Sequence, residues 1–173
     1  MPQRIVLVGM MGAGKTSVGT EVARRLGWRW WDNDVELQRE SGRDARTLVA
    51  ALGVEAAHAE ETRVLLEALR DLDRAVVAAA GSVVQDPRAV EALRGEWVVW
   101  LRARVETLAE RVRGGAHRPF MDAEVALTLH QLDAERRGLY EQVATLVVDV
   151  DDLSPAEVAG VVVDRWSSGA GLR

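Results

Sequence analysis

A short apolar segment runs directly into a glycine-rich turn near the start of this chain. Residues 4–8 have the sequence RIVLV, a β-branched run typical of a strand buried on both faces. Residues 9–16 have the sequence GMMGAGKT, which matches the pattern G-x-x-x-x-G-K-[ST] at every fixed position. Residues 16–26 carry apolar side chains at helical spacing and are followed by Gly27. A strand, a glycine loop and a helix in this order predict an α/β fold built on a parallel sheet.

The loop has the composition that phosphate binding requires. Glycines let backbone N–H groups converge on phosphate oxygens, and the helix that follows adds the positive end of its dipole. Lys15 is the sole lysine among 22 basic residues, and its compact ammonium suits the β- and γ-phosphates of a nucleotide. Thr16 follows it with a hydroxyl suited to Mg2+. We expect ATP to bind at Gly9, Gly12, Ala13, Gly14, Lys15, Thr16 and Ser17.

The composition excludes several other classes of site. The chain has no cysteine, which excludes disulfides and thiol catalysis, and its three histidines lack metal-ligand spacing. The formal net charge is -5 and the arginines are spread along the chain, so we expect no nucleic-acid partner. The first apolar stretch is too short for a membrane span, so we expect a cytoplasmic protein with no membrane partner. The 173 residues with 48% hydrophobic content fit one domain, 1–173, which we expect to be a monomer.

Further apolar runs alternate with helical patterns along the chain. Strand-like runs occur at residues 28–31, 75–79, 97–101 and 145–150. Helix-spaced apolar residues occur at 55–72, 87–93, 105–112 and 124–143, and the sequence SPAE at 154–157 opens a last helix. Right-handed crossovers place these helices on both faces of the sheet. Five of the six tryptophans lie in or beside the predicted strands, which favours core packing over base stacking.

Two aspartates follow the second predicted strand. Asp32 and Asp34 stand at its carboxyl end, where the ligands of open α/β sheets gather. In one interpretation, Asp32 supports Mg2+ through water and Asp34 accepts a hydrogen bond from the hydroxyl group to be phosphorylated. In the other, the aspartates cap a helix that starts near Val35. The two roles are compatible, because one aspartate can cap while the other binds.

The most irregular internal segment has the sequence RGGAHRP at residues 113–119. Two glycines and a proline beside basic residues, between two predicted helices, indicate either a mobile lid or an ordinary surface loop. We place this lid at residues 112–124. The tail at residues 167–173 is expected to be flexible.

Four more motifs accompany the glycine loop and the paired aspartates. They are ESGR at 40–43, GVE at 53–55, Arg118-Pro119 and RRGLY at 136–140. Together the motifs resemble, in order and approximate spacing, those of the shikimate kinase family over nearly the whole chain. The resemblance implies a three-layer P-loop kinase fold, similar to nucleoside monophosphate kinases, with a five-stranded parallel sheet in the order 2-3-1-4-5. It also implies transfer of the γ-phosphate of ATP, with Mg2+, to the 3-hydroxyl of shikimate, a step of aromatic amino acid biosynthesis.

The resemblance assigns roles to three arginines. Arg118 looks like the lid arginine that reaches both the substrate and the transferring phosphate. Arg136 looks like the arginine that holds the shikimate carboxylate, and Arg111 is similar to the residue that lies against adenine. These roles suit guanidinium groups, which bind carboxylates bidentately and stack on π-faces. Without the resemblance, Arg136 would be interpreted as a solvent-facing helix residue.

Two departures from the family pattern fall on the acceptor side. The family has an arginine, a second ligand of the shikimate carboxylate, where this chain has His58, which is shorter and largely neutral at pH 7. The family has three glycines against the substrate where this chain has Ala79, Ala80 and Gly81, so two methyl groups restrict that space. The predicted acceptor site therefore consists of Asp34, His58, Ala80, Gly81 and Arg136.

The predicted catalytic residues are Lys15, Asp34 and Arg118. Shikimate is the expected acceptor, and two alternatives follow from the departures. The first is a kinase of the same fold acting on another polyhydroxylated ring or sugar acid. The second is a nucleotide-binding regulatory protein that has lost phosphoryl transfer, against which the intact donor-side residues argue.

Overall fold

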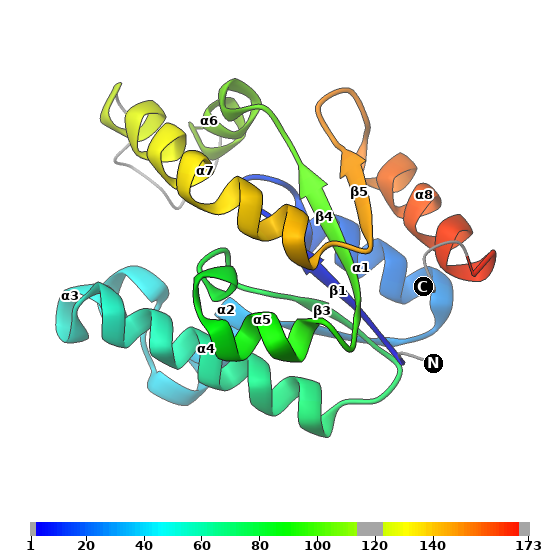
Figure 1. The fold of residues 1–173 in the computed structure, drawn as a ribbon, viewed down its shortest axis with the longest axis horizontal. Coiled ribbons are helices and arrows are strands. Elements are labelled where there is room, and N and C mark those ends of the chain that lie inside the picture. The colour runs from blue at the N-terminus through cyan, green and yellow to red at the C-terminus, as the bar shows by residue number, and fades with distance from the viewer. Residues whose placement is uncertain (1–2, 114–122, 170–173) are drawn as a thin grey trace.

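Five parallel strands form a sheet at the centre of the fold (Figure 1). The computed structural model describes residues 3–113 and 123–169. The strands are β1 (Arg4–Val8), β2 (Arg29–Asp32), β3 (Ala75–Ala78), β4 (Trp97–Arg102) and β5 (Leu146–Asp149). Their order across the sheet is β2-β3-β1-β4-β5, and every neighbouring pair is parallel. The predicted sheet and its strand order are confirmed.

The central strands are buried because helices cover both faces of the sheet. Every residue of β3 is buried, and β1 and β4 are buried except at one end. Their sequences are nearly continuous apolar runs, as in parallel strands without a solvent-facing side. The edge strand β5 differs, because Val147 is exposed whereas Val148 is buried. The core is therefore continuous through the centre of the sheet and thinner at this edge.

Helices lie on both faces of the sheet (Figure 1). On one face, α1 (Lys15–Leu26) packs against α8 (Pro155–Ser167). The other face is covered by α4 (Val54–Asp71), α5 (Pro87–Leu93) and α7 (Ala123–Val143). The other helical elements of the described residues are α2 (Asn33–Ser41), α3 (Ala45–Leu52), the short 3-10 helix η1 (Val83–Gln85) and α6 (Val105–Arg113). This arrangement has the three layers that the sequence predicts.

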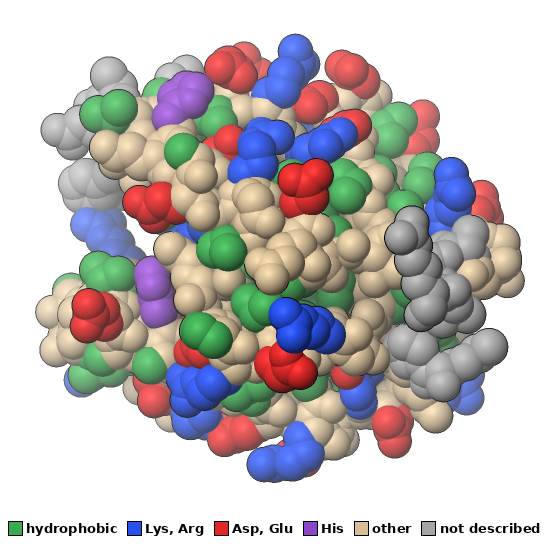
Figure 2. All heavy atoms as spheres, in the orientation of Figure 1, with side chains coloured by type: hydrophobic (Ala, Val, Ile, Leu, Met, Phe, Trp, Pro, Cys, Tyr) green, Lys and Arg blue, Asp and Glu red, His purple; other side chains and the backbone are tan. Residues whose placement is uncertain are grey.

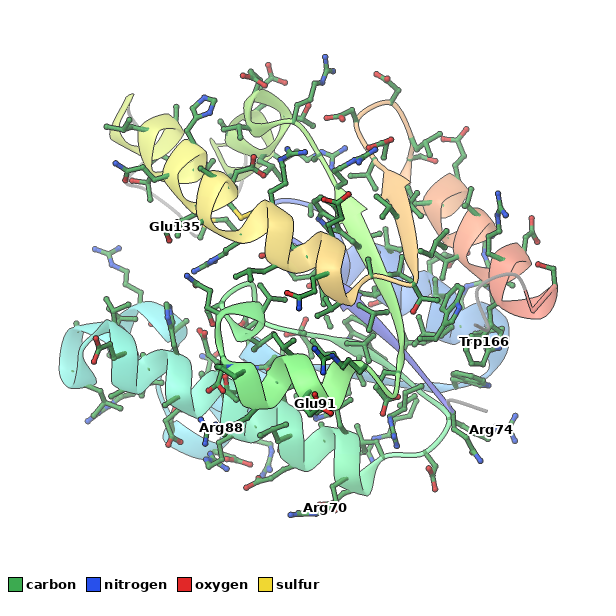
Figure 3. All side chains as sticks on the ribbon, viewed as in Figure 1. Arg70, Arg74, Arg88, Glu91, Glu135 and Trp166 are labelled. Atoms are coloured by element: carbon green, nitrogen blue, oxygen red, sulfur yellow. The ribbon has the colours of Figure 1, made fainter. Side chains whose placement is uncertain are left out.

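The tryptophans pack in the core, as predicted. Trp97 and Trp100 of β4 are both buried. Trp166, in the last turn of α8, packs edge-on against Trp28 and Trp97, with ring centroids 5.3 Å and 5.2 Å away (Figure 3). Edge-to-face aromatic pairs at this separation stabilise a contact beyond the area that they bury. They hold the C-terminal helix against the sheet.

Side-chain caps set the start of several described helices, among them α8 and α3. Ser154 opens α8 in a capping box, in which its side chain accepts from the N–H of Glu157 and the Glu157 carboxylate accepts from the N–H of Ser154. This cap is predicted from the sequence. Asp44 likewise caps α3, accepting from the N–H of Thr47 at 2.7 Å. Helix α3 is not predicted, because its eight residues span barely two turns, which is too short for a helix to be identified from sequence alone.

Two segments named in the sequence prediction lie partly outside the described residues. Helix α6 ends at Arg113 and α7 begins at Ala123, so most of the predicted lid is not described. Ser167 is the last residue of α8, and residues 170–173 of the predicted tail lie outside the described part of the chain.

On the face shown in Figure 2, basic and acidic side chains are interspersed. None of the described helices is long and apolar enough to cross a membrane.

Candidate active site

The loop between β1 and α1 requires glycine at its fixed positions. Gly9, Gly12 and Gly14 have φ angles of 143°, 82° and 95°, which side-chain-bearing residues rarely adopt. A Cβ on Gly9 would lie 2.7 Å from the carbonyl oxygen of Leu101, and one on Gly12 would lie 2.9 Å from a methyl carbon of Val112. The loop therefore follows a path open to glycine alone, and it ends at the N-terminus of α1, where anions bind favourably.

Lys15 is the first residue of α1, and its side chain folds back over the loop. Its Nζ donates to the carbonyl oxygens of Gly9 at 2.8 Å and Met10 at 3.2 Å. The neighbouring Ala13 is buried in the loop, whereas Ser17 is exposed in the first turn of α1. The ammonium is thus positioned within the loop predicted to bind the nucleotide phosphates.

Thr16 and Asp32 meet at the carboxyl ends of β1 and β2. The Thr16 hydroxyl donates to Asp32 Oδ2 at 3.1 Å. Asp32 Oδ1 accepts from the backbone N–H groups of Asp34 at 2.9 Å and Val35 at 3.4 Å, so Asp32 also caps α2. A hydroxyl and a carboxylate are the hard oxygen donors that Mg2+ takes while it keeps several waters. The pair fits a magnesium site, although the described residues hold no metal-binding cluster of three or more His, Cys, Asp or Glu side chains.

Arg136 of α7 is buried rather than solvent-facing. It is 7% exposed, and its Nε donates to Oε1 of Gln85 in η1 at 2.9 Å. Tyr140, one turn further along α7, donates its hydroxyl to the carbonyl oxygen of Gly81 at 2.8 Å. A Cβ on Gly81 would lie 3.3 Å from both Arg136 Nη1 and the Tyr140 hydroxyl. The guanidinium therefore lies against the turn that follows β3, where the sequence places the acceptor.

A buried carboxylate that we did not predict, Glu61, lies on the same side of the sheet. It is 8% exposed, and Ser82 Oγ donates a short hydrogen bond to its Oε2. Burial raises the pKa of Glu61 above 4.5, and the hydrogen bond from Ser82 only partly offsets this rise. The signal in the sequence is its position on α4, three residues after His58, because residues at this spacing share a helix face.

Residues predicted for the donor and acceptor sides both influence the pKa of Glu61. The negative charge of Asp34 adds to the rise in the Glu61 pKa, whereas the positive charges of Arg136 and Lys15 oppose it. Three residues predicted for different roles therefore act electrostatically on one buried carboxyl group. Asp34 is exposed in the first turn of α2, and capping of that helix falls to Asp32.

The two departures on the acceptor side have distinct physical effects. His58 is half-buried, and both burial and the charge of Arg136 lower its pKa below 6.5, so its imidazole is neutral at pH 7. Ala79 and Ala80 are buried. Among the described residues, Arg74 is the one non-glycine residue with a positive φ, so the alanine methyl groups take up volume without straining the backbone.

Arg111 lies at the other end of the glycine loop. Its Nη2 donates to the carbonyl oxygen of Val150 at 2.7 Å, and its Nη1 lies 3.5 Å from the carbonyl oxygen of Gly12. The side chain thus connects the loop to the segment after β5, beside the position expected for the nucleotide base. Arg118, the predicted lid arginine, lies outside the described residues.

Known proteins share this fold and sequence pattern. Similar solved structures include a shikimate kinase from Acinetobacter baumannii in complex with shikimate, with a TM-score of 0.90 and 28% identity, covering 98% of this chain and 96% of that one. A gluconokinase from Sinorhizobium meliloti has a TM-score of 0.66 at 21% identity, covering 98% of both chains, and shows the shared fold alone.

Sequence comparisons identify the family. A shikimate kinase from Symbiobacterium thermophilum is 38% identical over 165 residues, covering 93% of this chain and 94% of the relative. One from Coxiella burnetii is 35% identical over 159 residues, covering 90% of this chain and 88% of the relative. The family model described as "Shikimate kinase" matches residues 11–167. With its P-loop, parallel sheet and buried Arg136, this chain belongs to the shikimate kinase family of phosphotransferases that act on a hydroxyl group.

Proposed function

We propose that this protein transfers the γ-phosphoryl group of ATP to the 3-hydroxyl of shikimate in the presence of Mg2+. The observation that carries the proposal is geometric: the Lys15 ammonium lies over the glycine loop, and the buried Arg136 guanidinium lies against the turn after β3. This arrangement supports a phosphate-binding ammonium and a carboxylate-binding guanidinium at the carboxyl ends of the strands, with Asp34 as the proposed ligand of the reacting hydroxyl. The shikimate kinases among its relatives, one of them solved with shikimate, support the assignment.

On the donor side, the glycine loop and Lys15 hold the phosphates of ATP. Backbone N–H groups and the N-terminus of α1 face the anion, and the Lys15 ammonium exchanges its carbonyl partners for phosphate oxygens. Magnesium would bind Thr16 directly and Asp32 through water, where it would neutralise charge on the phosphates. Arg111 lies against the base. Catalysis on this side consists of positioning and electrostatic stabilisation.

On the acceptor side, Asp34 and Arg136 orient the substrate. The Asp34 carboxylate accepts a hydrogen bond from the 3-hydroxyl and directs its oxygen toward the γ-phosphorus. The Arg136 guanidinium, held by Gln85, binds the ring carboxylate with its remaining N–H groups. Ala80, Gly81 and His58 form the wall of the pocket. Arg118 stabilises the charge on the transferring phosphoryl group.

A second acceptor class has a specific observation in its favour. His58 is neutral at pH 7, so Arg136 faces the acceptor carboxylate without a second cation from this position. One guanidinium binds a carboxylate less tightly than two, which lowers the preference for an anionic ring. A kinase of the same mechanism acting on another polyhydroxylated ring or sugar acid is therefore the second candidate.

The test is a coupled assay of ADP formation with MgATP and shikimate. We expect saturable, shikimate-dependent ADP formation, a product phosphorylated at the 3-hydroxyl by NMR, and loss of activity in Asp34→Asn and Arg136→Met. Asp152→Asn, an exposed aspartate of the loop before α8, is the matched control for the first change. ADP formation that does not increase on adding shikimate would reject this substrate.

The broader properties of the chain are proposed on the same basis. One sheet with a continuous core supports a single domain over residues 1–173. We further propose that the enzyme acts in the cytoplasm as a monomer, because the residues proposed to bind both substrates surround the carboxyl ends of a single sheet. Light scattering on the purified protein tests the monomer.

A further inference from the structure

Tyr140 is a buried residue of α7 to which the proposed catalytic roles assign no task. Its exposed fraction is 0%, and it stands four residues after Arg136, which places both side chains on the same face of the helix. It is also the one tyrosine of the chain. A buried phenol carries a polar group that has to be paired, so the partners of its hydroxyl indicate its role.

The Tyr140 hydroxyl lies between the Arg136 guanidinium and the turn after β3. It donates to the carbonyl oxygen of Gly81 at 2.8 Å and accepts a hydrogen bond from Arg136. A phenol has one proton to donate, so the oxygen serves both partners at once. Burial raises the pKa of Tyr140 to about 12, although the positive charge of Arg136 opposes this rise. The hydroxyl therefore keeps its proton and remains a donor to Gly81 at neutral pH.

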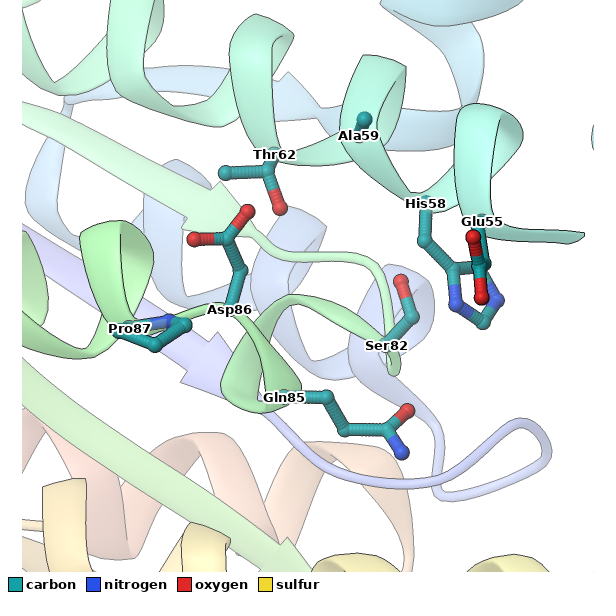
Figure 4. Close-up of a pocket in the computed structure, with 8 residues that line it drawn as sticks. All are labelled: Glu55, His58, Ala59, Thr62, Ser82, Gln85, Asp86 and Pro87. Carbon is teal, nitrogen blue, oxygen red and sulfur yellow. The ribbon is translucent and has the colours of Figure 1, made fainter.

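The Arg136 guanidinium is held at two points. Its Nε donates to Oε1 of Gln85 at 2.9 Å, and a second hydrogen bond goes to the Tyr140 hydroxyl. Figure 4 shows the Gln85 side chain extending away from Asp86 and Pro87, the two residues that follow it. A guanidinium is planar and has five N–H donors, so two such bonds set its orientation and leave further donors for a carboxylate.

The ring of Tyr140 is fixed to the centre of the sheet. It stacks on Trp100 of β4, with ring centroids 5.8 Å apart and an angle of 29° between the planes. Trp100 is buried, and it is the register partner of Val8, the last residue of β1 before the glycine loop. The hydroxyl is thus positioned by the two strands whose carboxyl ends carry the predicted phosphate site.

The turn after β3 also passes close to the glycine loop. A Cβ on Gly81 would lie 3.5 Å from the carbonyl oxygen of Gly9, and Lys15 Nζ donates to this same oxygen at 2.8 Å. The turn that Tyr140 holds therefore lies between the guanidinium of the acceptor side and the ammonium of the donor side.

We propose that Tyr140 is a positioning residue for the acceptor carboxylate. Its hydroxyl holds the Arg136 guanidinium and the turn after β3 in one arrangement, and the carboxylate binds to the N–H groups that are oriented in this way. The hydroxyl acts through Arg136 and does not itself contact the acceptor. The inference rests on the proposed function for the carboxylate that Arg136 binds, and it adds a residue to that function.

Tyr140→Phe removes the hydroxyl and keeps the ring on Trp100. It should raise the KM for shikimate about tenfold, the equivalent of one charge-assisted hydrogen bond, and leave the KM for ATP within about twofold. A role in folding alone would not move these two constants apart. Arg4→Met, which removes hydrogen bonds at the amino ends of the strands, is the control for lost stability and should change neither constant.

The single tyrosine allows a second measurement that requires neither turnover nor a folded variant. Tyrosine isotopically labelled at Cζ, the carbon that bears the hydroxyl, gives one protein resonance in NMR, that of Tyr140. The carboxylate competes with the phenol oxygen for the N–H groups of Arg136, so saturating shikimate should shift this resonance. ADP should leave it in place.

The outcomes separate the inference from the function on which it rests. Turnover of shikimate with an unmoved resonance, or with an unchanged KM in Tyr140→Phe, overturns the positioning role and leaves the proposed function in place. Equal increases in the KM for shikimate and for ATP also overturn it, as does a shift that persists in Arg136→Met. A shifted resonance without turnover rejects the proposed function and supports the positioning role, whereas neither turnover nor a shift rejects both.

Discussion

Ser82 donates a hydrogen bond to Glu61 across the space between η1 and α4, and both residues are buried. Burial raises the Glu61 pKa more than this hydrogen bond lowers it. The folded protein therefore retains a proton on Glu61 at pH values where the unfolded chain has released it. Because the folded and unfolded states bind different numbers of protons at Glu61, the free energy of unfolding depends on pH through this residue.

Glu61 should make stability fall with rising pH. Above the unfolded pKa of about 4.5, the folded state binds more protons than the unfolded state, so the free energy of unfolding decreases as the pH rises through the folded pKa. Glu61→Gln keeps a hydrogen-bond acceptor for Ser82 but cannot titrate, so this decrease should be absent. Urea unfolding between pH 4.5 and 8 measures it. Parallel stability curves for wild type and variant would contradict the raised pKa, and Glu91→Gln provides an exposed control.

His58→Arg should strengthen shikimate binding. A guanidinium at this position adds a charge-assisted hydrogen bond to the acceptor carboxylate, which is worth about 1.5 kcal/mol or more, so the KM for shikimate should fall about tenfold. Steady-state kinetics at saturating ATP give the value. His58→Gln, which is neutral like the native imidazole at pH 7, should leave KM within about threefold. An unchanged KM in the arginine variant would mean that residue 58 does not face the carboxylate.

Lys15→Ala should remove turnover and preserve the fold. The ammonium is the cation of the glycine loop, and loss of a comparable transition-state charge costs about 10³-fold in kcat. Circular dichroism and the thermal midpoint should change little. Lys15→Arg retains the charge but replaces the compact ammonium with a planar fork, and it should also be strongly impaired. Normal activity in the alanine variant would rule out the phosphate role.

Arg4→Met should destabilise the protein without affecting catalysis. Arg4 pairs with the 6% exposed Glu96 through two hydrogen bonds of 3.0 Å and 2.6 Å, and it donates to the carbonyl oxygen of Leu72 at 2.6 Å. Removing it leaves a nearly buried carboxylate unpaired, which costs about 3 kcal/mol in unfolding free energy. These residues lie at the amino ends of the strands, opposite the proposed active site, so kcat and KM should be unchanged.

The double variant Arg4→Met/Glu96→Leu is the control for that prediction. It removes the unpaired charge and should recover most of the lost stability, as urea unfolding would show. A double variant no more stable than Arg4→Met would mean that the loss came from the bond to Leu72 or from packing of the arginine stem.

The parts of the fold that could be predicted are those set by a short, local sequence pattern, such as an apolar run or a helix cap. The apolar runs of β1 and β4 are hydrophobic enough to identify buried strands, and the Ser154 capping box identifies the start of α8. Helix α3 was missed because it is short: eight residues form barely two turns, and the helix packs against α4. The start of α2 was placed near Val35 rather than Asn33, since a cap sequence alone does not identify which aspartate accepts the backbone hydrogen bonds.

The path of the glycine loop was predictable because its residues are adjacent in sequence. Lys15 and Thr16 belong to one loop whose glycines dictate its path. The acceptor side is assembled by tertiary packing, and its residues come from α2, α4, α7 and the turn after β3. The only local signal for Glu61 is its helical spacing from His58, and the bond to Ser82 leaves none. The burial of Arg136 follows from the position of α7 against η1.

The edge-on contacts of Trp166 with Trp28 and Trp97 also provide an optical reporter. Indole fluorescence depends on the surroundings of the ring, and these three rings lie together where α8 meets the sheet. Trp31 stands apart, because it precedes Asp32 at the phosphate end of β2. In a Trp31→Phe protein the indole beside Asp32 is absent, so a change in the emission of the cluster of Trp28, Trp97 and Trp166 would report detachment of the last helix from the sheet.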